Sequence, residues 1–381
     1  MIQRQDLLER VRRALARNPI VAIVGPRQCG KTTLAQQFLP EAESTYFDLE
    51  DPAVADALAD PMTTLTPLRG LIVIDEAQRR PELFPVLRVL ADRKKHDAHF
   101  LILGSASPEL SRQASESLAG RVEIIEMTGF AQTEIPAADQ HKLWLRGGFP
   151  RSFLARNEAD SYEWRRQFVR TFVERDIALL GFHIAPAAIG RFWTMLAHYH
   201  GQVFNGSEIA SALSVGTQTA HNYLDALEQT FMVRRLPPWY VNVGKRLVKS
   251  PKIYLRDSGL FHSLQNIRDT GVLVAHPKVG ASWEGFALEQ ILRQFPGEDA
   301  YFYAIHSGSE LDLYLPALGL GFEIKRKDAP KRTRSMDITM QDLGLKKLYV
   351  IYPGTRSYPL DKNIQAVPLS ANLNGLKEKF N

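Results

Sequence analysis

The stretch GPRQCGKTT, residues 25–33, follows directly on the apolar run IVAIV and leads into a segment with helical periodicity. A short, β-branched apolar run is typical of a strand buried in a parallel sheet. The glycines are therefore expected to turn the chain from a strand into a helix, where backbone amides and a helix N-terminus can hold phosphate groups. The alternative is a tight turn that binds nothing. The first part of the chain is thus expected to be α/β.

The phosphate-loop pattern assigns an expected role to each residue type in this stretch. Gly25 and Gly30 let the backbone wrap the phosphates, Lys31 reaches the β and γ phosphates of a nucleotide, and the Thr32 hydroxyl coordinates Mg²⁺. The expected nucleotide-binding residues are Gly25, Pro26, Arg27, Gln28, Cys29, Gly30, Lys31, Thr32 and Thr33.

Two further apolar runs end in residues suited to the chemistry of phosphate hydrolysis. LIVIDEAQ, residues 71–78, places Asp75 to hold Mg²⁺ and Glu76 to orient and deprotonate a water molecule. FLILGSAS, residues 100–107, places Ser105 to sense the γ-phosphate or to help position that water. The alternatives are a solvated acidic turn after the first run and a serine-rich turn after the second.

Arg121 precedes another apolar run, VEIIEM. It could neutralise transition-state charge on a nucleotide in its own subunit or in a neighbouring one, which would require a homo-oligomer. It could equally form an ion pair with Glu123 or Glu126. The alternating strands and helices predict a three-layer α/β sheet with its ligand at the carboxyl ends of the strands.

These motifs together resemble a known family. GPRQCGKTT, YFDLED, LIVIDEAQ, LILGSAS and LAGR are similar to the AAA-type ATPase core of bacterial and archaeal ATP-binding proteins that carry a C-terminal domain of unknown function. GGFPRSF and TFVERDIALL, in the middle of the chain, also resemble that family, so the resemblance covers nearly the whole sequence. It implies a P-loop NTPase core of the AAA type and ATP rather than GTP.

The composition is that of a folded protein of several domains. The chain has 381 residues, 45% of them hydrophobic, and a formal net charge of only +5. Any affinity for nucleic acid must therefore come from local clusters of Lys and Arg. The N-terminus lacks the apolar segment of a signal peptide, no run is long enough to span a bilayer, and Cys29 is the single cysteine. We expect a cytoplasmic protein without a membrane partner.

The middle of the chain divides into two helical patterns. Residues 131–200 read as a helical lid, in which Arg175 and Asp176 are interpreted as a surface ion pair. Residues 201–262 read as a winged helix-turn-helix, with a helix capped by Ser207, a turn at Gly216, a recognition helix and two wing strands. The expected DNA contacts are Thr217, Gln218, Thr219, Asn222, Lys245, Arg246 and Lys249. Such a module can instead bind a protein.

The last third, residues 263–381, resembles a PD-(D/E)xK nuclease-like fold. Glu284 lies on an expected amphipathic helix, and Asp312, Glu323 and Lys325 follow on successive strands, although Leu311 replaces the leading proline of the signature. Asp312 and Glu323 could bind Mg²⁺ near a phosphodiester, and Lys325 could help activate water. The alternatives are a solvated, salt-bridging strand and a nuclease fold that binds DNA or protein without cutting it.

The sequence thus predicts four parts: an ATPase core at 1–130, then the lid, the winged helix and the nuclease-like domain. One hypothesis is a nucleotide-driven switch or motor that acts on nucleic acid, with ATP and Mg²⁺ as cofactors. The other is a signalling or interaction ATPase whose C-terminal domains are catalytically inert and bind a protein partner.

Overall fold

The computed structural model describes residues 2–40, 43–93, 97–105, 116–240, 248–305, 308–373 and 375. The chain forms two compact units. Unit 1 consists of Met1–Gly129, Glu174–Ile184 and Gln229–Phe231. Unit 2 consists of Phe130–Val173, Ala185–Glu228 and Met232–Asn381.

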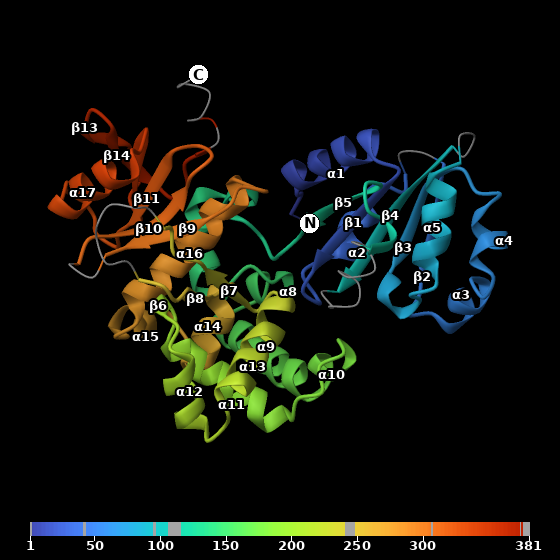
Figure 1. Cartoon of the computed structure of the whole chain (residues 1–381), viewed down its shortest axis with the longest axis horizontal. Helices are drawn as coiled ribbons and strands as arrows, with labels where there is room; N and C mark the ends of the chain where they lie inside the picture. The colour runs from blue at the N-terminus through green and yellow to red at the C-terminus, as the bar shows by residue number, and fades with distance from the viewer. Residues whose placement is uncertain are drawn as a thin grey trace. The chain divides into compact units, whose positions relative to one another are not determined.

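Unit 1 is built on a five-stranded parallel sheet with the order β2-β3-β4-β1-β5 (Figure 1). Its strands are β1 (Ile20–Gly25), β2 (Ser44–Asp48), β3 (Gly70–Asp75), β4 (Ala98–Ser105) and β5 (Val122–Glu126). Every residue of β1 is buried, as its continuous apolar run predicts. Since all five strands are parallel, their carboxyl ends share one edge, where the phosphate loop, Asp75 and Ser105 lie.

Helices cover both faces of this sheet. Its helices are α1 (Gln5–Arg17), α2 (Lys31–Ala35), α3 (Pro52–Ala57), α4 (Pro61–Leu65) and α5 (Leu83–Ala91), with a 3₁₀ turn at Ala77–Arg79. One face packs Ile72, Ile74 and Phe100 against the apolar residues of α4 and α5. α1 and α2 pack against β1 and β4. The architecture is therefore the three-layer α/β fold that the sequence predicts.

The long helical segment that starts with α9 is not one regular α-helix. α9 (Glu158–Thr171) leads into a π-helical turn at Phe172–Asp176 and then into α10 (Ile177–Leu179). Residues Glu174–Ile184 belong to unit 1, although the residues on both sides of them belong to unit 2. The chain therefore leaves unit 2 and returns to it through a short excursion.

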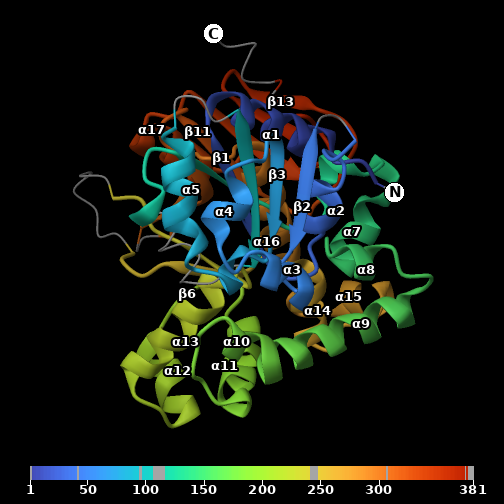
Figure 2. The ribbon, with the colours of Figure 1, turned by 90° about the vertical axis from the view of Figure 1, so that its right-hand side faces the viewer.

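The central part of unit 2 combines helices with a small antiparallel sheet, in the order β6-β8-β7. Figure 2 shows α11, α12 and α13 grouped together beside β6. The elements are 3₁₀ turns at Gln132–Glu134 and Ala137–Asp139, α7 (Gln140–Arg146), α8 (Pro150–Phe153), α11 (Pro186–His198), β6 (Gln202–Val203), α12 (Gly206–Leu213), α13 (Thr217–Gln229), β7 (Val233–Leu236), β8 (Lys252–Leu255), α14 (Ser258–Leu264) and α15 (Thr270–Ala275).

Two local predictions for α12 are wrong. The cap is Asn205, whose side chain accepts a hydrogen bond from the backbone N–H of Glu208, while the Ser207 hydroxyl donates to the Asn205 side chain. The turn after the helix uses Ser214, which has a left-handed φ of 55°, rather than Gly216. Asn and Ser can both take these positions because their short polar side chains bond locally to the backbone.

The C-terminal part of unit 2 is a six-stranded mixed sheet with the order β13-β14-β12-β11-β10-β9. Strands β9 to β11 are antiparallel, whereas β12 runs parallel to β11 and β14. The elements are α16 (Val279–Gln294), β9 (Tyr301–Ala304), β10 (Glu310–Leu315), β11 (Leu320–Ile324), α17 (Arg334–Leu343), β12 (Lys347–Tyr352), β13 (Tyr358–Asp361) and β14 (Ile364–Pro368).

α16 is not the amphipathic helix that the sequence predicts. Ten of its sixteen residues are buried, among them the polar residues Glu289, Gln290 and Gln294. Buried polar groups need partners, and these side chains bond to other segments of unit 2. None of the helices in the described part of the chain combines the length and apolar content needed to cross a membrane.

Candidate nucleotide site and carboxylate cluster

The phosphate loop between β1 and α2 has the backbone conformation that its glycines allow. Gln28 and Gly30 have positive φ angles of 63° and 98°. A Cβ at Gly25 would lie 1.9 Å from the Met127 carbonyl oxygen, so this glycine is needed for close packing against the end of β5. The Cys29 thiol is buried and donates to the same carbonyl at 3.5 Å. Only the backbone of Cys29 can therefore face a ligand.

Lys31 and Thr32 begin α2 and lie where their expected roles require. The Lys31 ammonium donates to the backbone carbonyls of Gly25 and Pro26 at 3.1 and 3.0 Å. The Thr32 hydroxyl donates to Oδ2 of Asp75 at 2.7 Å. A hydroxyl and a carboxylate oxygen thus meet beside the loop, and both are ligands that Mg²⁺ accepts. The residues present fit a magnesium-bound nucleotide. Thr33 is exposed on the next position of α2.

Tyr46 of β2 is a second partner of Asp75 that the sequence reasoning missed. Its hydroxyl donates to Asp75 Oδ2 at 2.8 Å. Burial and the charge of Asp75 raise the pKa of Tyr46 well above its usual value, so the hydroxyl stays a donor. The motif YFDLED contains this tyrosine, and the parallel pairing of β2 with β3 is the signal that could have placed it near Asp75.

Glu76 directly follows β3 in a left-handed conformation, with φ 54°. This unusual backbone turns its carboxylate toward Gln78, which donates to it, and toward Ser105, whose hydroxyl lies 3.4 and 3.5 Å from its two oxygens. Ser105 is buried at the end of β4, which lies between β1 and β3 in the sheet. The sheet order therefore brings Ser105 and Glu76 to the same edge as the phosphate loop.

Arg27 of the phosphate loop forms an ion pair with Asp176, with 2.6 Å between Nη1 and Oδ1. Asp176 is buried and ends the π-helical turn. The interpretation of Arg175 and Asp176 as a surface pair is therefore wrong, because Asp176 contacts the loop 149 residues earlier while Arg175 is exposed.

Arg121 does not pair with Glu123 or Glu126. Its guanidinium donates to both oxygens of Asp92, just after α5, at 2.6 and 2.9 Å. Glu123 instead binds Arg17. The hydrogen bond that Arg121 donates to Asp92 raises the pKa of Arg121, and the pair is largely exposed. A catalytic role for Arg121 stays a prediction.

Four of the seven residues expected to contact DNA lie at the start of α13. Thr217, Gln218 and Asn222 are exposed, and Thr219 is partly buried. Gln218 donates to the Asn222 side chain at 3.0 Å. Lys249 is exposed, whereas Lys245 and Arg246 lie outside the described residues.

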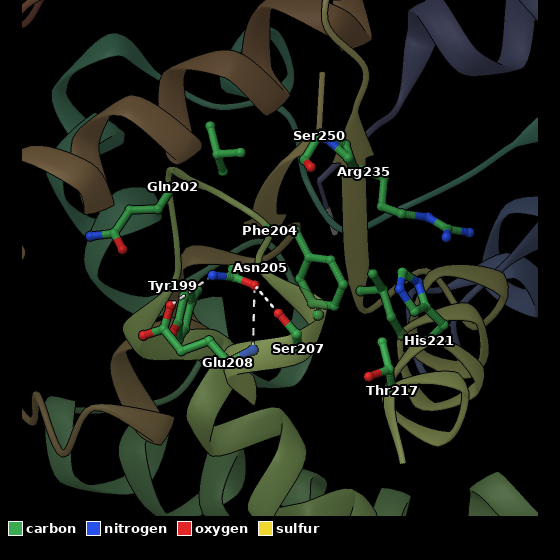
Figure 3. A pocket seen from close by; sticks show the side chains of 14 residues that line it. Tyr199, Gln202, Phe204, Asn205, Ser207, Glu208, Thr217, His221, Arg235 and Ser250 are labelled. Carbon is green, nitrogen blue, oxygen red and sulfur yellow. Dashed lines mark hydrogen bonds between the residues drawn. The ribbon is translucent and has the colours of Figure 1, made fainter. Parts of the chain in front are cut away.

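A hollow of about 830 Å³ opens beside the start of α13. In Figure 3 the side chains of Thr217, His221 and Arg235 lie on one side of it and Asn205 and Glu208 on the other. Arg235 of β7 is bound to Asp225 at 2.9 Å and also to Glu228, so its charge is largely balanced.

The described parts of the β7–β8 connection pair with β9, the edge strand of the six-stranded sheet. Phe302 donates from its backbone to Pro237, and Trp239 donates to Phe302, at 3.0 and 2.7 Å. Val248 donates to the Ala304 carbonyl at 3.3 Å. Both sides of the predicted wing are thus hydrogen-bonded to the C-terminal sheet.

The predicted nuclease residues come together on the α16 side of this sheet. Oδ2 of Asp312 accepts the backbone N–H of Ile324 at 2.7 Å, and Glu323 and Lys325 form an ion pair at 2.5 Å. Burial, with the charge of Asp312, raises the pKa of Glu284 to about 7 and that of Glu323 to about 8. Burial also raises the pKa of Asp312.

Lys252 of β8 is a further member of this cluster that the sequence reasoning missed. It is 5% exposed, it binds Glu310 and its ammonium lies 3.6 Å from Glu284 Oε1. The hydroxyl of Tyr254 donates to the same Glu284 oxygen at 2.6 Å. Among the described residues, no group of three or more His, Cys, Asp or Glu side chains could hold a metal ion. With an ammonium at this position, the cluster does not fit the Mg²⁺ that the resemblance implies.

The parallel sheet, phosphate loop and Asp75 define a P-loop NTPase core of the AAA type. An AAA domain family matches residues 17–136, and two domains of unknown function, DUF8612 and DUF4143, match residues 137–271 and 279–371. The chain belongs to the same family as two mycobacterial proteins, the uncharacterized proteins Rv2008c of Mycobacterium tuberculosis and Mb2031c of Mycobacterium bovis. Each is 51% identical to it over 97% of this chain and 84% of its own length.

A solved structure extends the likeness in fold. The Walker-type ATPase PABY2304 of Pyrococcus abyssi superposes with a TM-score of 0.52 and 13% identity. The superposition covers 70% of this chain and 96% of that one. The likeness therefore reaches beyond the AAA domain.

Proposed function

We propose that the protein binds ATP with Mg²⁺ and hydrolyses it at the carboxyl edge of the five-stranded sheet. The observation that carries this proposal is the 2.7 Å hydrogen bond between Thr32 and Asp75, next to an ammonium that rests on two backbone carbonyls. Charge-assisted bonds to phosphate are stronger than bonds to neutral carbonyls, so a nucleotide phosphate can replace the partners of Lys31.

The residues around the phosphate position would then have separate roles in binding and hydrolysis. Lys31 and the loop amides stabilise negative charge on the phosphates, and Thr32 and Asp75 hold the Mg²⁺, which neutralises charge developing in the transition state. Glu76 accepts a proton from the attacking water, and Ser105 keeps the Glu76 carboxylate oriented.

Phosphate release from Mg·ATP tests this proposal, with ATP binding measured in parallel. We expect Lys31→Ala to lose both binding and hydrolysis. Glu76→Gln should keep binding and lose hydrolysis by about 10²–10⁴-fold, because only the proton acceptor is removed. Glu82→Gln, which changes an exposed carboxylate a few residues away, is the matched control. A Glu76→Gln variant with wild-type turnover would refute the assignment.

We further infer that the nucleotide state is passed to the attached domains as a switch. The support is the Arg27–Asp176 ion pair, because Arg27 lies in the phosphate loop and Asp176 lies in the short excursion between α9 and α11. A phosphate that drew Arg27 away would leave a buried carboxylate without its partner, which would disfavour the present conformation of that segment.

We propose nucleic acid as the target of the switch, through α12 and α13 as a helix-turn-helix with β7 and β8 as wing strands. The exposed polar residues at the start of α13 support this, since such residues suit contacts to bases and phosphates. The alternative, a protein partner, is favoured by the balanced charge of Arg235 and by the pairing of the wing with β9.

Fluorescence anisotropy with labelled duplex DNA at several salt concentrations separates these two targets. If α13 reads DNA, the double variant Gln218→Ala/Asn222→Ala should weaken binding by about tenfold or more. Ser211→Ala, on the exposed side of α12, should not. No measurable DNA binding at low salt, with and without ATP, would favour the protein partner.

For the six-stranded sheet with α16 we propose a nuclease-like fold, supported by the convergence of Glu284, Asp312, Glu323 and Lys325. Cleavage of linear and circular DNA with Mg²⁺ or Mn²⁺, compared between wild type and Asp312→Ala, tests whether the domain cuts. Cleavage that disappears in Asp312→Ala would establish a nuclease.

A further inference from the structure

The carboxylate cluster of unit 2 already contains a cation of its own. Lys252 is the first residue of β8, in the small sheet, and its side chain ends among carboxylates supplied by α16 and β10. It is 5% exposed, and so is largely removed from water. A buried ammonium is costly unless opposite charges surround it, so its position is specified by the cluster.

The contacts of Lys252 are those that a bound cation would make. Its ammonium binds Glu310 and lies 3.6 Å from Glu284, and it interacts electrostatically with Asp312. Burial lowers the pKa of Lys252, but the charges of Glu284, Asp312 and Glu310 outweigh this and keep the pKa well above its usual value. The side chain is therefore charged at every physiological pH.

A second ammonium interacts with the same group of carboxylates. Lys325 binds Glu323 at 2.5 Å and also interacts with Asp312. Four carboxyl groups, those of Glu284, Glu310, Asp312 and Glu323, therefore share two fixed positive charges. A divalent cation among the same oxygens would be repelled by both ammoniums.

We propose that Lys252 is the resident cation of this cluster, taking the place that a divalent metal would occupy, so that the domain keeps its nuclease-like arrangement without a metal. Lys252 instead joins the small sheet to the six-stranded one, because its own strand belongs to the first and Glu310 to the second. The pairing of Pro238 with Phe302 joins the same two sheets.

This inference rests on the proposed nuclease-like fold and is independent of ATP hydrolysis. Its test is Mn²⁺ binding by the full-length chain without nucleotide, measured by calorimetry and by the free Mn²⁺ signal in electron paramagnetic resonance. We compare wild type, Asp312→Asn, Lys252→Met and the double variant Lys252→Met/Asp312→Asn. Any weak Mn²⁺ binding at Asp75 is common to all four chains, so the Asp312→Asn difference isolates the cluster.

We expect Asp312→Asn to leave Mn²⁺ binding of the wild type unchanged. Lys252→Met should gain a site that binds Mn²⁺ at least about tenfold more tightly than wild type, because the repelling ammonium is gone. The double variant should lose that site again. Lys249→Met, an exposed lysine three residues away, is the matched control and should behave as wild type.

Two results would overturn the inference in different ways. A wild-type Mn²⁺ site that Asp312→Asn removes would show that metal and Lys252 coexist, and the nuclease-like fold would stand. A folded Lys252→Met chain without a new site would show that these carboxylates do not form a metal site at all, and the fold assignment would fall too. If Lys252→Met is too unstable to purify, the wild type and Asp312→Asn comparison still decides the first point.

Discussion

The nucleotide site of unit 1 and the charge clusters of unit 2 both contain buried lysines or carboxylates. The two regions differ in the partners that these charged groups have. Lys31 rests on two neutral backbone carbonyls. Lys252 rests on Glu310 and Glu284, and Glu289 of α16 rests on Arg234 and Arg256. The first arrangement leaves positive charge for a ligand, whereas the second has already balanced it.

This difference separates a site built for binding from one built for holding the fold together. A charge whose partners are weak gains much when a charged ligand arrives, and it contributes little to folding. A buried charge that is matched by an opposite charge gains little from a charged ligand but matters for folding, since removing either partner leaves the other buried and unpaired.

The largest contrast is expected between Lys252→Met and Lys31→Ala. Removing Lys252 leaves buried carboxylates without their positive partner and should lower the free energy of unfolding by about 3–5 kcal/mol. Removing Lys31 leaves two carbonyls that can bond to water and should lower it by about 1 kcal/mol or less. Chemical denaturation of both variants without nucleotide measures the two effects. Equal losses of stability in the two variants would contradict the proposed difference between the two lysines.

Glu289→Gln should show the next largest effect, and one that depends on pH. Burial opposes ionisation, but Arg234 and Arg256 lower the pKa of Glu289 to about 2 from a usual value of 4.5. The carboxylate therefore stabilises the fold above pH 4.5, and this stabilisation is lost as pH falls toward 2. The shift corresponds to about 3 kcal/mol at neutral pH.

Denaturation of wild type and Glu289→Gln across this pH range tests the direction in which the stabilisation by Glu289 changes with pH. The stability difference between the two chains should be full above pH 5 and should shrink steadily below it. Asp299→Asn, an exposed carboxylate beyond the same helix, is the control and should show no such trend. A difference that grows on acidification would contradict the assignment.

Tyr46→Phe should have a smaller effect that falls on ligand binding. It removes the 2.8 Å hydrogen bond to Asp75, which costs about 1 kcal/mol. Asp75 keeps its bond to Thr32, so we expect a Mg·ATP affinity within about tenfold of wild type. Titration with a fluorescent ATP analogue measures this. A loss as complete as that of Lys31→Ala would place Tyr46 among the essential ligands.

The smallest effect is expected for Arg121→Ala. The exposed pair with Asp92 should change the melting temperature little, because solvent screens exposed ion pairs. If the role of Arg121 is this pair alone, ATP turnover per chain is unchanged and is independent of protein concentration. A drop in turnover, together with wild-type turnover that rises with concentration, would instead place Arg121 at a neighbouring subunit's nucleotide site.

Much of unit 1 could be predicted because its signals are local. The apolar run before Gly25, the glycine loop and the acidic pair after the next strand each form a short pattern whose structure follows from nearby residues. β1, β3 and β4 therefore appear where the sequence predicts them. Local patterns also gave a wrong prediction at α16, where a helix expected to be amphipathic is largely buried.

The partners of charged residues could not be predicted, because they come from distant positions. Arg27 meets Asp176, and Lys252 meets Glu310, only because the sheets and helices carry them there. An ion pair with Glu123 or Glu126 was one of two interpretations of Arg121, but its partner Asp92 is 29 residues earlier in the chain. The choice between such partners is made by packing, which a short window of sequence does not contain.

Residue type and spacing are enough to predict the phosphate loop, its strands and the candidate residues Lys31, Thr32, Asp75 and Glu76, since backbone conformation and burial there depend on nearby residues. What each buried charge faces depends instead on how distant segments pack together. Lys31 faces carbonyls that a ligand can replace, and Lys252 faces carboxylates that it neutralises. The two side chains are chemically identical, and their electrostatic surroundings make them different.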